Sequence, residues 1–532
     1  MSPGQTTTST TLKKLIADRV ASRIYAKDAS LWPPESPGAE PAAEIMGWLD
    51  LPSLLEHKIP SLDDAARGLR DRGMTDVVVL GMGGSSMTPE VLRVVFGKQP
   101  SGMNLHVLDT VNPGTIGPVT AALPLATTTF IVASKSGTTV EPLSLEKHFR
   151  VALADAGIDD IDSHFIAITD GGTPLANRAR QGQFVHWFEA PRDVGGRFSA
   201  LTAFGMLPAA ALGIELRKLR QSANRMASAC MTDSEGNPGL SLGAALGANA
   251  LAGRDKVTLI TSTGLERFGL WVEQLLAEST GKQNKGLIPV AAEQLYPVDW
   301  YGADRNFVYV RLDGADNSAT DKHIATLESS GHPVVTLGMC DLHDIGAEFF
   351  RWEFATAVAG HIIGIFPFDQ PDVNAAKDKA RAILGSGKLP SSDSESDIAT
   401  AVKLITETPK HGDYVAIGAF MPESEEASEA FSKLRAFITK TTGMATTFGY
   451  GPRYLHSTGQ LYKGGPSSIR FFGVVSHGNG DIKVLGESYT LGALTPAQAY
   501  GDFEVLRDRG RRIRTATARN NAVAEIEGAL RD

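Results

Sequence analysis

The strongest indication of the fold is the stretch Phe130-Ile-Val-Ala-Ser-Lys-Ser-Gly-Thr-Thr-Val-Glu-Pro142. Its first three residues are apolar or β-branched and predict a buried strand, and Pro142 suits the first turn of a helix. The loop between them offers four hydroxyls and one ammonium, on Ser134, Lys135, Ser136, Thr138 and Thr139. Together with the N–H groups of a helix start, these side chains can bind a dianionic phosphate. The loop is neither a Walker loop nor a GxGxxG fingerprint. Its composition alone therefore also fits an ordinary Ser/Thr-rich connection between a strand and a helix.

The same order of strand, small-residue loop and helix occurs earlier in the chain. Asp76-Val-Val-Val-Leu80 predicts a buried strand that leads into Gly81-Met-Gly-Gly-Ser-Ser-Met-Thr-Pro-Glu90. Further strands are expected at Leu105 to Leu108 and at Phe165 to Thr169. Strands that alternate with helices of crossover length indicate an α/β fold with a parallel, doubly wound sheet, whose ligands bind at the carboxyl ends of the strands.

The rest of the chain predicts two further α/β units. The second has expected strands at Lys256 to Thr261, Asn306 to Leu312 and Pro333 to Leu337, with helices that include Leu265 to Glu278 and Asp369 to Leu384. Gly385 to Ser396 has the composition of a linker. Beyond it, strands are expected at Tyr414 to Phe420, Ala445 to Tyr450, Ile469 to Val475 and Ile482 to Leu485. We therefore divide the chain into residues 1–40, a tail and a helix over Leu12 to Tyr25, and units at 41–215, 216–388 and 397–532.

Composition excludes several classes of protein. The 532 residues are 42% hydrophobic, which is enough for large cores, and length alone favours two to four domains. The net charge is −9, and we find no basic run with interleaved aromatic residues, so nucleic acid is not an expected partner. Cys230 and Cys340 lack metal-ligand spacing, and no stretch resembles a signal peptide or a membrane span. We expect a cytoplasmic location.

Several separate motifs from Gly81 to Lys377 resemble, in order, those of the phosphoglucose isomerase family. Together they are more specific than any one alone. The resemblance is closest to the isomerase portion of bacterial transaldolase/phosphoglucose isomerase fusions, here without a transaldolase part. It implies two doubly wound sugar isomerase (SIS) domains with parallel sheets, at 41–215 and 216–388, and a smaller C-terminal α/β unit.

The resemblance also implies which loops hold the substrate. Gly84 and Ser85 match the family's glycine-rich loop, where backbone N–H groups approach the sugar phosphate. Residues 134–139 match its phosphate loop. Arg197 matches the arginine that faces the reacting carbons, where a guanidinium stabilises the negative oxygen of a cis-enediolate. A lone arginine at a helix start is more commonly a surface or ion-pair residue.

Glu278 matches the family's catalytic glutamate, which moves a proton between C2 and C1 as a single base. Gln274 lies four residues earlier, on the same helix face, and matches a glutamine that contacts the substrate. A solvated charge is the ordinary role of a glutamate near a helix end. The helix dipole, however, does not favour an anion at the C-terminal end.

Gln370 and Lys377 match a sugar-binding glutamine and a lysine that assists ring opening. They are two helical turns apart on the helix expected from Asp369 to Leu384, so both can face one ligand. The family's ring-opening histidine usually lies between the glutamate and lysine motifs, but 286–322 contains no histidine. The nearest match is His456 in Leu455-His-Ser-Thr-Gly-Gln460, with Glu141 as its expected partner. A structural role for His456 in the C-terminal unit is the alternative.

These observations predict an isomerase that interconverts glucose 6-phosphate and fructose 6-phosphate, as a step of glycolysis and gluconeogenesis. We expect no cofactor and no metal, a phosphosugar as the small-molecule ligand, no membrane partner and, by resemblance, a homodimer. One alternative is an isomerase of another phosphosugar, such as mannose 6-phosphate, or one of dual specificity. The other is a non-catalytic regulator that binds a sugar phosphate on the same fold.

Overall fold

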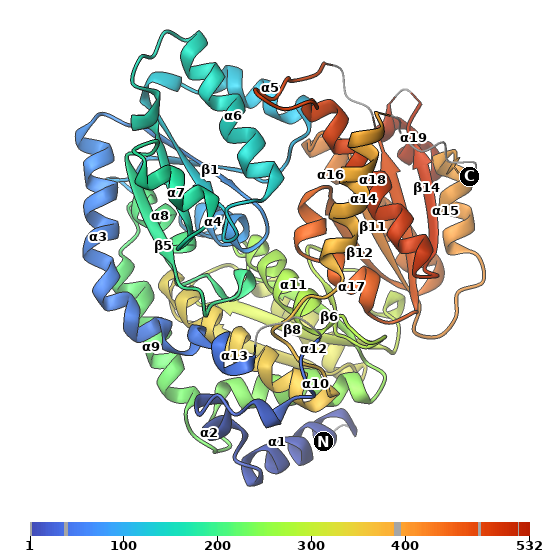
Figure 1. Ribbon diagram of the computed structural model, residues 1–532. Helices are drawn as coiled ribbons and strands as arrows, with labels where there is room; N and C mark the ends of the chain where they lie inside the picture. Colours follow the sequence, from blue (N-terminus) through green and yellow to red (C-terminus); the bar gives the residue numbers. More distant parts are fainter. Residues whose placement is uncertain (1–2, 37–40, 388–394, 477–479, 520, 532) are drawn as a thin grey trace.

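The computed structural model describes residues 3–36, 41–387, 395–476, 480–519 and 521–531. Figure 1 shows three α/β units, coloured from blue to teal, from green to yellow, and from orange to red along the chain. Each unit contains one sheet of four or five strands, and within the described residues all neighbouring strands of the three sheets are parallel. The predicted α/β class with doubly wound parallel sheets is confirmed.

The first sheet has the strand order β2-β1-β3-β4-β5. Its central strands are buried along their whole length, as expected of a sheet that helices cover on both faces. On β3 the ring of Phe130 stacks on Phe149 and Phe165, with centroids 4.4 and 5.2 Å away. The strands are β1 (Asp76–Gly81), β2 (Asn104–Leu108), β3 (Thr128–Ala133), β4 (Phe165–Asp170) and β5 (His186–Ala190). The helices are α3 (Leu51–Asp71), α4 (Gly84–Phe96), α5 (Pro113–Ala122), α6 (Val140–Asp155), α7 (Pro174–Arg180) and α8 (Ala203–Leu212).

The second sheet has the order β7-β6-β8-β9. Its helix α13 is apolar almost all round and is buried between neighbouring helices. The strands are β6 (Lys256–Thr261), β7 (Ile288–Val290), β8 (Arg305–Leu312) and β9 (Val334–Met339). The helices are α9 (Leu216–Cys230), α10 (Pro238–Leu251), α11 (Glu266–Thr280), α12 (Ser318–Ser329) and α13 (Ile345–Ile363).

The third sheet has the order β10-β14-β13-β11-β12. Its strands are β10 (Glu395–Ser396), β11 (Tyr414–Phe420), β12 (Ala445–Tyr450), β13 (Ile469–Val475) and β14 (Arg512–Thr517). The helices around it are α14 (Val373–Ser386), α15 (Ile398–Thr406), α16 (Glu425–Thr442), α17 (Gly459–Gly464), α18 (Leu491–Asp508) and α19 (Ala522–Ala529). Helix α14, which the predicted second unit includes, packs mainly against α18.

All three sheets share one winding pattern. If the two-residue strand β10 is left out and the strands of each unit are numbered in chain order, the first four strands lie side by side in the order 2-1-3-4 in every sheet. The winding reverses between strands 1 and 3, and ligands of such sheets bind at the carboxyl ends of the strands near that point. Helix α11 contacts α4 of the first unit, α13 of the second and α17 of the third. It therefore lies where the three units meet, as Figure 1 shows.

Most predicted strands agree with the structure within two residues, but several elements differ. The N-terminal helix is two helices, α1 (Pro3–Ala17) and α2 (Val20–Tyr25), because Arg19 between them has a left-handed backbone with φ 54°. The strand expected at Ile482 to Leu485 forms only an isolated bridge, since Ile482 and Val484 pack into an apolar cluster of the first unit. Residues 388–394 of the expected linker lie outside the described ranges.

Candidate functional site

The glycine-rich loop and the hydroxyl loop follow β1 and β3, the two strands at the reversal point of the first sheet. At Gly83 the backbone has φ +61°, and an added Cβ would lie 2.7 Å from the carbonyl oxygen of His456. At Gly84 an added Cβ would lie 1.8 Å from the carbonyl oxygen of Gly196. Glycine is therefore required here because the loop packs directly against two other segments of the site.

The side chain of Ser85 stays within its own loop. Its Oγ accepts from the N–H of Met82 at 3.0 Å and donates to the Met82 carbonyl at 2.9 Å. Ser85 is also buried. In this conformation its hydroxyl stabilises the turn after β1, so any ligand contact from this loop would come mainly from backbone groups.

The hydroxyl loop, residues 134–139, is preorganised by contacts among its own side chains. Ser134 Oγ lies 2.8 Å from Thr139 Oγ1, and Ser136 Oγ lies 3.0 Å from Thr138 Oγ1. Gly137 has φ +65°, which lets the chain turn between Ser136 and Thr138. The loop ends at the first turn of α6, where backbone N–H groups favour an anion.

Lys135 points away from this loop. Its ammonium donates to Asp170 Oδ2 at 2.5 Å and to the Arg192 carbonyl at 3.1 Å. Asp170 ends β4, the neighbour of β3, so the sheet register brings the two side chains together. In this conformation Asp170 neutralises Lys135, and the hydroxyl loop has no free ammonium of its own.

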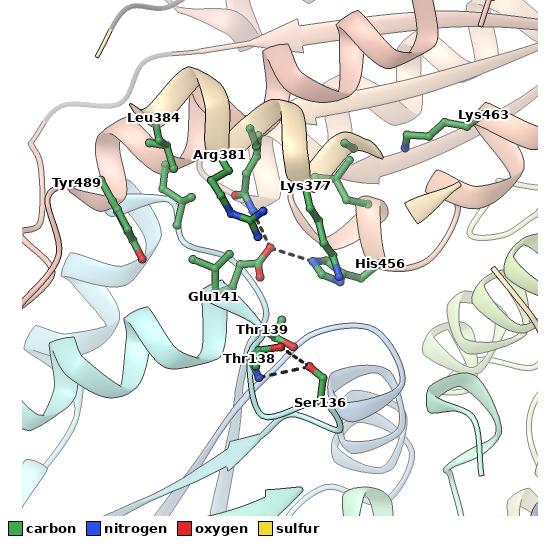
Figure 2. Close-up of a pocket in the computed structure, with 16 residues that line it drawn as sticks. Ser136, Thr138, Thr139, Glu141, Lys377, Arg381, Leu384, His456, Lys463 and Tyr489 are labelled. Atoms are coloured by element: carbon green, nitrogen blue, oxygen red, sulfur yellow. Dashed lines mark hydrogen bonds and ion pairs between the residues drawn. The ribbon is translucent and has the colours of Figure 1, made fainter. Parts of the chain in front are cut away.

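A cavity of about 390 Å³ opens between the hydroxyl loop and the C-terminal unit. The first unit contributes residues 136–141, and the C-terminal unit contributes α14, the segment around His456, and α18 (Figure 2). Lys377 and Arg381 lie one helical turn apart on α14 and line the wall opposite the hydroxyls. Figure 2 shows Lys377 extending from α14 toward His456. The cavity thus has hydroxyls on one side and cations on the other.

His456 follows β12, at the carboxyl edge of the third sheet, and its side chain contacts the first unit. Its Nε2 lies 2.9 Å from Glu141 Oε1, and Gln498 Nε2 donates to the same oxygen at 2.6 Å. Burial opposes ionisation of Glu141, but the His456 imidazole and the hydrogen bonds from His456 and Gln498 hold the pKa of Glu141 below its usual value. A fixed carboxylate that accepts from one ring nitrogen orients the imidazole for proton transfer at the other.

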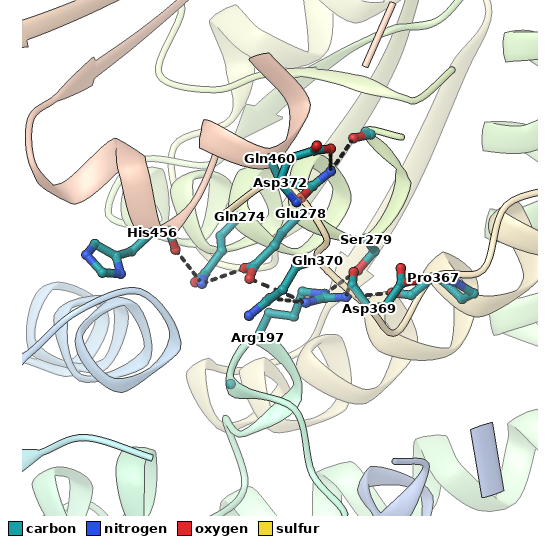
Figure 3. A network of polar contacts seen from close by, with 12 residues as sticks. Arg197, Gln274, Glu278, Ser279, Pro367, Asp369, Gln370, Asp372, His456 and Gln460 are labelled. Carbon is teal, nitrogen blue, oxygen red and sulfur yellow. Dashed lines mark hydrogen bonds and ion pairs between the residues drawn. The ribbon is translucent and has the colours of Figure 1, made fainter. Parts of the chain in front are cut away.

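Glu278 lies in a second group of side chains, at the C-terminal end of α11 (Figure 3). Gln274 is on the same helix face and donates from Nε2 to Glu278 Oε2 at 3.1 Å. Arg197 Nη1 is 3.4 Å from Glu278 Oε1. Both charged side chains are nearly buried, so the guanidinium offsets part of the cost of burying the carboxylate.

The other donors of Arg197 hold the segment before α14. Its Nε donates to Ser279 Oγ at 2.7 Å, and Nη2 donates to the carbonyls of Pro367 and Asp369. Nη1 donates to Gln370 Oε1 at 2.8 Å. Arg197 is therefore both the charge beside Glu278 and a structural tie between the first two units.

The expectation that Gln370 and Lys377 share one helix is wrong. The helix was predicted from Asp369, but α14 begins at Val373. Arg197 and Lys282 donate to the carbonyls of Phe366, Pro367 and Asp369, so these carbonyls do not take part in a helix. Gln370 consequently belongs to the Glu278 group, whereas Lys377 lines the cavity with His456.

Lys282, in the turn after α11, is the second cation that holds this segment. Its Nζ donates to the Phe366 carbonyl at 2.7 Å and to the Asp369 carboxylate at 2.5 Å. Burial, together with the nearby charge of Arg197, lowers the pKa of Lys282 to about 8. Lys282 lies only four residues after Glu278, but nothing in the sequence predicts its contact with this segment.

His456 connects the two groups. Its carbonyl accepts from Gln274 Nε2 at 3.0 Å, while its imidazole contacts Glu141. The glycine loop passes beside the same carbonyl. A ligand with its anionic end at the hydroxyl loop can therefore place its other end near His456 and the Glu278 carboxylate, all within one chain.

The arrangement has the parts needed for proton transfer on an anionic substrate. Glu278 is a carboxylate base with a guanidinium beside it, and His456 is an oriented imidazole. Hydroxyl groups and the cationic side chains of Lys377, Arg381 and Lys463 line the cavity. Sequence reasoning missed Gln498, Arg381, Lys463 and Tyr489, which also line the cavity. Only Arg381 had a usable signal, because it follows Lys377 by four residues on one helix face.

In the described part of the chain, no three His, Cys, Asp or Glu side chains form a group that could hold a metal ion. Nor does any helix there combine the length and apolar character needed to cross a membrane.

Comparisons with known proteins relate the chain to one family. The family profile described as "Phosphoglucose isomerase" matches residues 37–306, just over half of the chain. A glucose-6-phosphate isomerase of Rubrobacter xylanophilus is 30% identical over 386 residues, which cover 64% of this chain and 89% of the relative. A probable glucose-6-phosphate isomerase of Methanococcus maripaludis is 29% identical over 374 residues, 63% of this chain and 84% of the relative.

Two solved structures share the fold. A hypothetical protein of Thermus thermophilus superposes with a TM-score of 0.59 at 25% identity, over 70% of this chain and 95% of that one. A glucose-6-phosphate isomerase of Chlamydia trachomatis superposes with a TM-score of 0.54 at 22% identity, over 70% of this chain and 78% of that one. This second likeness supports the fold alone.

The family match includes both loops, Arg197, Gln274 and Glu278, whereas Gln370, Lys377 and His456 lie beyond it. The matched range thus contains the carboxylate and guanidinium pair that the structure brings together at the end of α11. The chain belongs to the phosphoglucose isomerase family.

Proposed function

We propose that the chain interconverts glucose 6-phosphate and fructose 6-phosphate through a cis-enediolate. His456 and Lys377 open the sugar ring, and Glu278 carries the proton between C2 and C1. Arg197 supplies positive charge beside Glu278 as the enediolate forms. The hydroxyl loop, with Arg381 across the cavity, holds the phosphate.

One observation supports this proposal more than any other. Glu278 is held by Gln274 at 3.1 Å and faces Arg197 at 3.4 Å, in a chain of this family. A protein that only binds a sugar phosphate needs the hydroxyl loop but neither a base nor a buried cation beside it. The pair therefore favours an isomerase over a regulator.

The decisive experiment is a coupled isomerase assay on the purified chain with a panel of sugar phosphates. Exchange of the C2 hydrogen in deuterated water should accompany turnover, because the proton that Glu278 removes can exchange with solvent before it is returned to carbon. Turnover of mannose 6-phosphate at a similar rate would indicate dual specificity. Binding of all these sugars without exchange would identify a regulator.

Replacing two hydroxyls of the phosphate loop should weaken substrate binding. In the double variant Ser134→Ala with Thr139→Ala, we expect KM to rise about tenfold or more, since a hydrogen bond to a charged group contributes about 1.5–3 kcal/mol. Turnover at saturation should change little. Thr127→Ala, before β3 at the opposite end of the strand, is the control. An unchanged KM with normal melting would place the phosphate elsewhere.

Replacing Arg197 by lysine should lower turnover more than affinity. Lysine keeps the charge but cannot make the planar set of contacts to Ser279, Gln370 and the carbonyls of 367–369. The melting temperature should also fall. Arg305→Lys, at a buried arginine paired with Glu293, should destabilise the fold without lowering turnover of the folded enzyme. If Arg197→Lys changed only KM, Arg197 would be a binding residue rather than a catalytic one.

By the same family resemblance we propose a cytoplasmic homodimer. The contacts that build the site described above all lie within one chain. Sedimentation equilibrium of the purified protein would test the dimer. A monomer with full turnover would separate assembly from catalysis.

A further inference from the structure

The C-terminal unit has a second cavity, of about 560 Å³, at the amino-terminal edge of its sheet. His456 lies at the opposite, carboxyl edge, so this cavity is separate from the one that contains the hydroxyl loop. Arginines dominate its lining. They are Arg470 at the start of β13, Arg507 on α18, and Arg511, Arg512 and Arg514 at the start of β14.

The contacts of these arginines leave positive charge in excess. Arg470 and Arg512 share one carboxylate, Asp413, with Nε of Arg470 at 2.8 Å and Nη2 of Arg512 at 2.6 Å. Nη1 and Nη2 of Arg470 donate to the carbonyls of Ile405, Glu407 and Thr408 at the end of α15. Two guanidinium charges thus face one negative charge at this position.

The next two arginines add to this excess. Arg511 donates to the carbonyls of Lys463 and Gly465, and Arg514 donates to the carbonyl of Ile513. A carbonyl oxygen satisfies an N–H group but carries no net charge. The described lining of the cavity is therefore strongly cationic, on a chain whose overall net charge is −9.

We propose that this arginine pocket, formed by Arg470, Arg511, Arg512 and Arg514 with Arg507 in its wall, binds a small, multiply charged anion of the phosphate class. Guanidinium forks match phosphate oxygens in paired hydrogen bonds, and several of them can bind one anion at once. The volume lies in the range of small-molecule sites. The proposal does not depend on the reaction proposed above, because no catalytic residue lines this pocket.

The test is a calorimetric titration with inorganic pyrophosphate at low salt. It uses the double variant Ser134→Ala with Thr139→Ala, so that the hydroxyl loop contributes little binding. In this background we expect one saturable site. Adding Arg514→Glu should weaken it about tenfold or more, because a repelling carboxylate replaces a cation. Arg514 is exposed, so the fold should tolerate the change.

Arg67→Glu is the matched control, since it makes the same charge change at an exposed position of α3 in the first unit. It should leave pyrophosphate affinity within twofold. Turnover of the hexose phosphate in an otherwise unaltered chain should be the same with and without Arg514→Glu. Equal weakening by both substitutions would mean nonspecific attraction, and absence of saturable binding would mean that the arginines serve only to hold carbonyls. Either result overturns the proposal.

Discussion

Glu278→Gln should lower turnover of glucose 6-phosphate by about 10²–10⁴-fold, with KM within a few-fold of the original. Glutamine has nearly the shape of glutamate, and its one amide oxygen can still accept from Arg197 or from Gln274, so the site should keep most of its geometry. It cannot remove a proton from carbon. Steady-state kinetics together with C2 hydrogen exchange in deuterated water measure the effect, and both rates should fall together.

Glu273→Gln provides a control on the same helix. Glu273 is also buried, and burial raises its pKa to about 8, so its carboxyl group is mostly neutral at pH 7. An amide should replace it there with little effect on turnover. If Glu278→Gln retained near-normal turnover, or if Glu273→Gln proved equally damaging, Glu278 would not be the base.

His456→Ala should depress turnover of the cyclic sugar by a similar factor, while C2 exchange on the open-chain form is largely retained. Ring opening needs a proton at the ring oxygen, and the imidazole held by Glu141 is placed to deliver it. Glu278 is unchanged in this variant, and the backbone carbonyl of residue 456 can still accept from Gln274. Comparing the two rates separates ring opening from isomerisation.

His456→Gln checks that the loss is chemical. A glutamine amide can donate to Glu141, so Glu141 keeps a partner, but it cannot transfer a proton at neutral pH. Both substitutions should therefore have the same effect on turnover, and the melting temperature of the glutamine variant should be near normal. Normal turnover by either variant would assign ring opening to Lys377 or to water and leave His456 a structural residue.

Sequence patterns predicted the elements whose signal is local. The apolar runs of β1, β3, β6 and β11 identified strands without ambiguity, because strands buried on both faces have little polar sequence. The helical spacing of Gln274 and Glu278 predicted a shared face, and the two side chains are hydrogen-bonded. Edge strands such as β5 were missed because they are partly exposed and lack an apolar run.

Contacts made at long range were not predictable in the same way. The hydroxyl loop suggested that Lys135 faces a phosphate, but its neighbour Asp170 comes from another strand and is set by sheet register. The sequence pattern placed Gln370 on a helix, whereas the buried cations Arg197 and Lys282 bind the carbonyls of its segment and the helix begins only at Val373. The arginine pocket likewise depends on Arg470, which lies far in sequence from 511–514.

The position of His456 has a consequence for when the chain becomes active during its synthesis. A ribosome makes Arg197 and Glu278 well before it makes the segment after β12, yet the glycine loop, Gln274 and Glu141 all contact residue 456. A nascent chain that has folded its first two sheets would hold a base and a cation but no completed cavity. We therefore expect catalysis to begin only after the last quarter of the chain has been released and has docked. A protease that cuts the chain before this last quarter would abolish turnover while leaving two folded units.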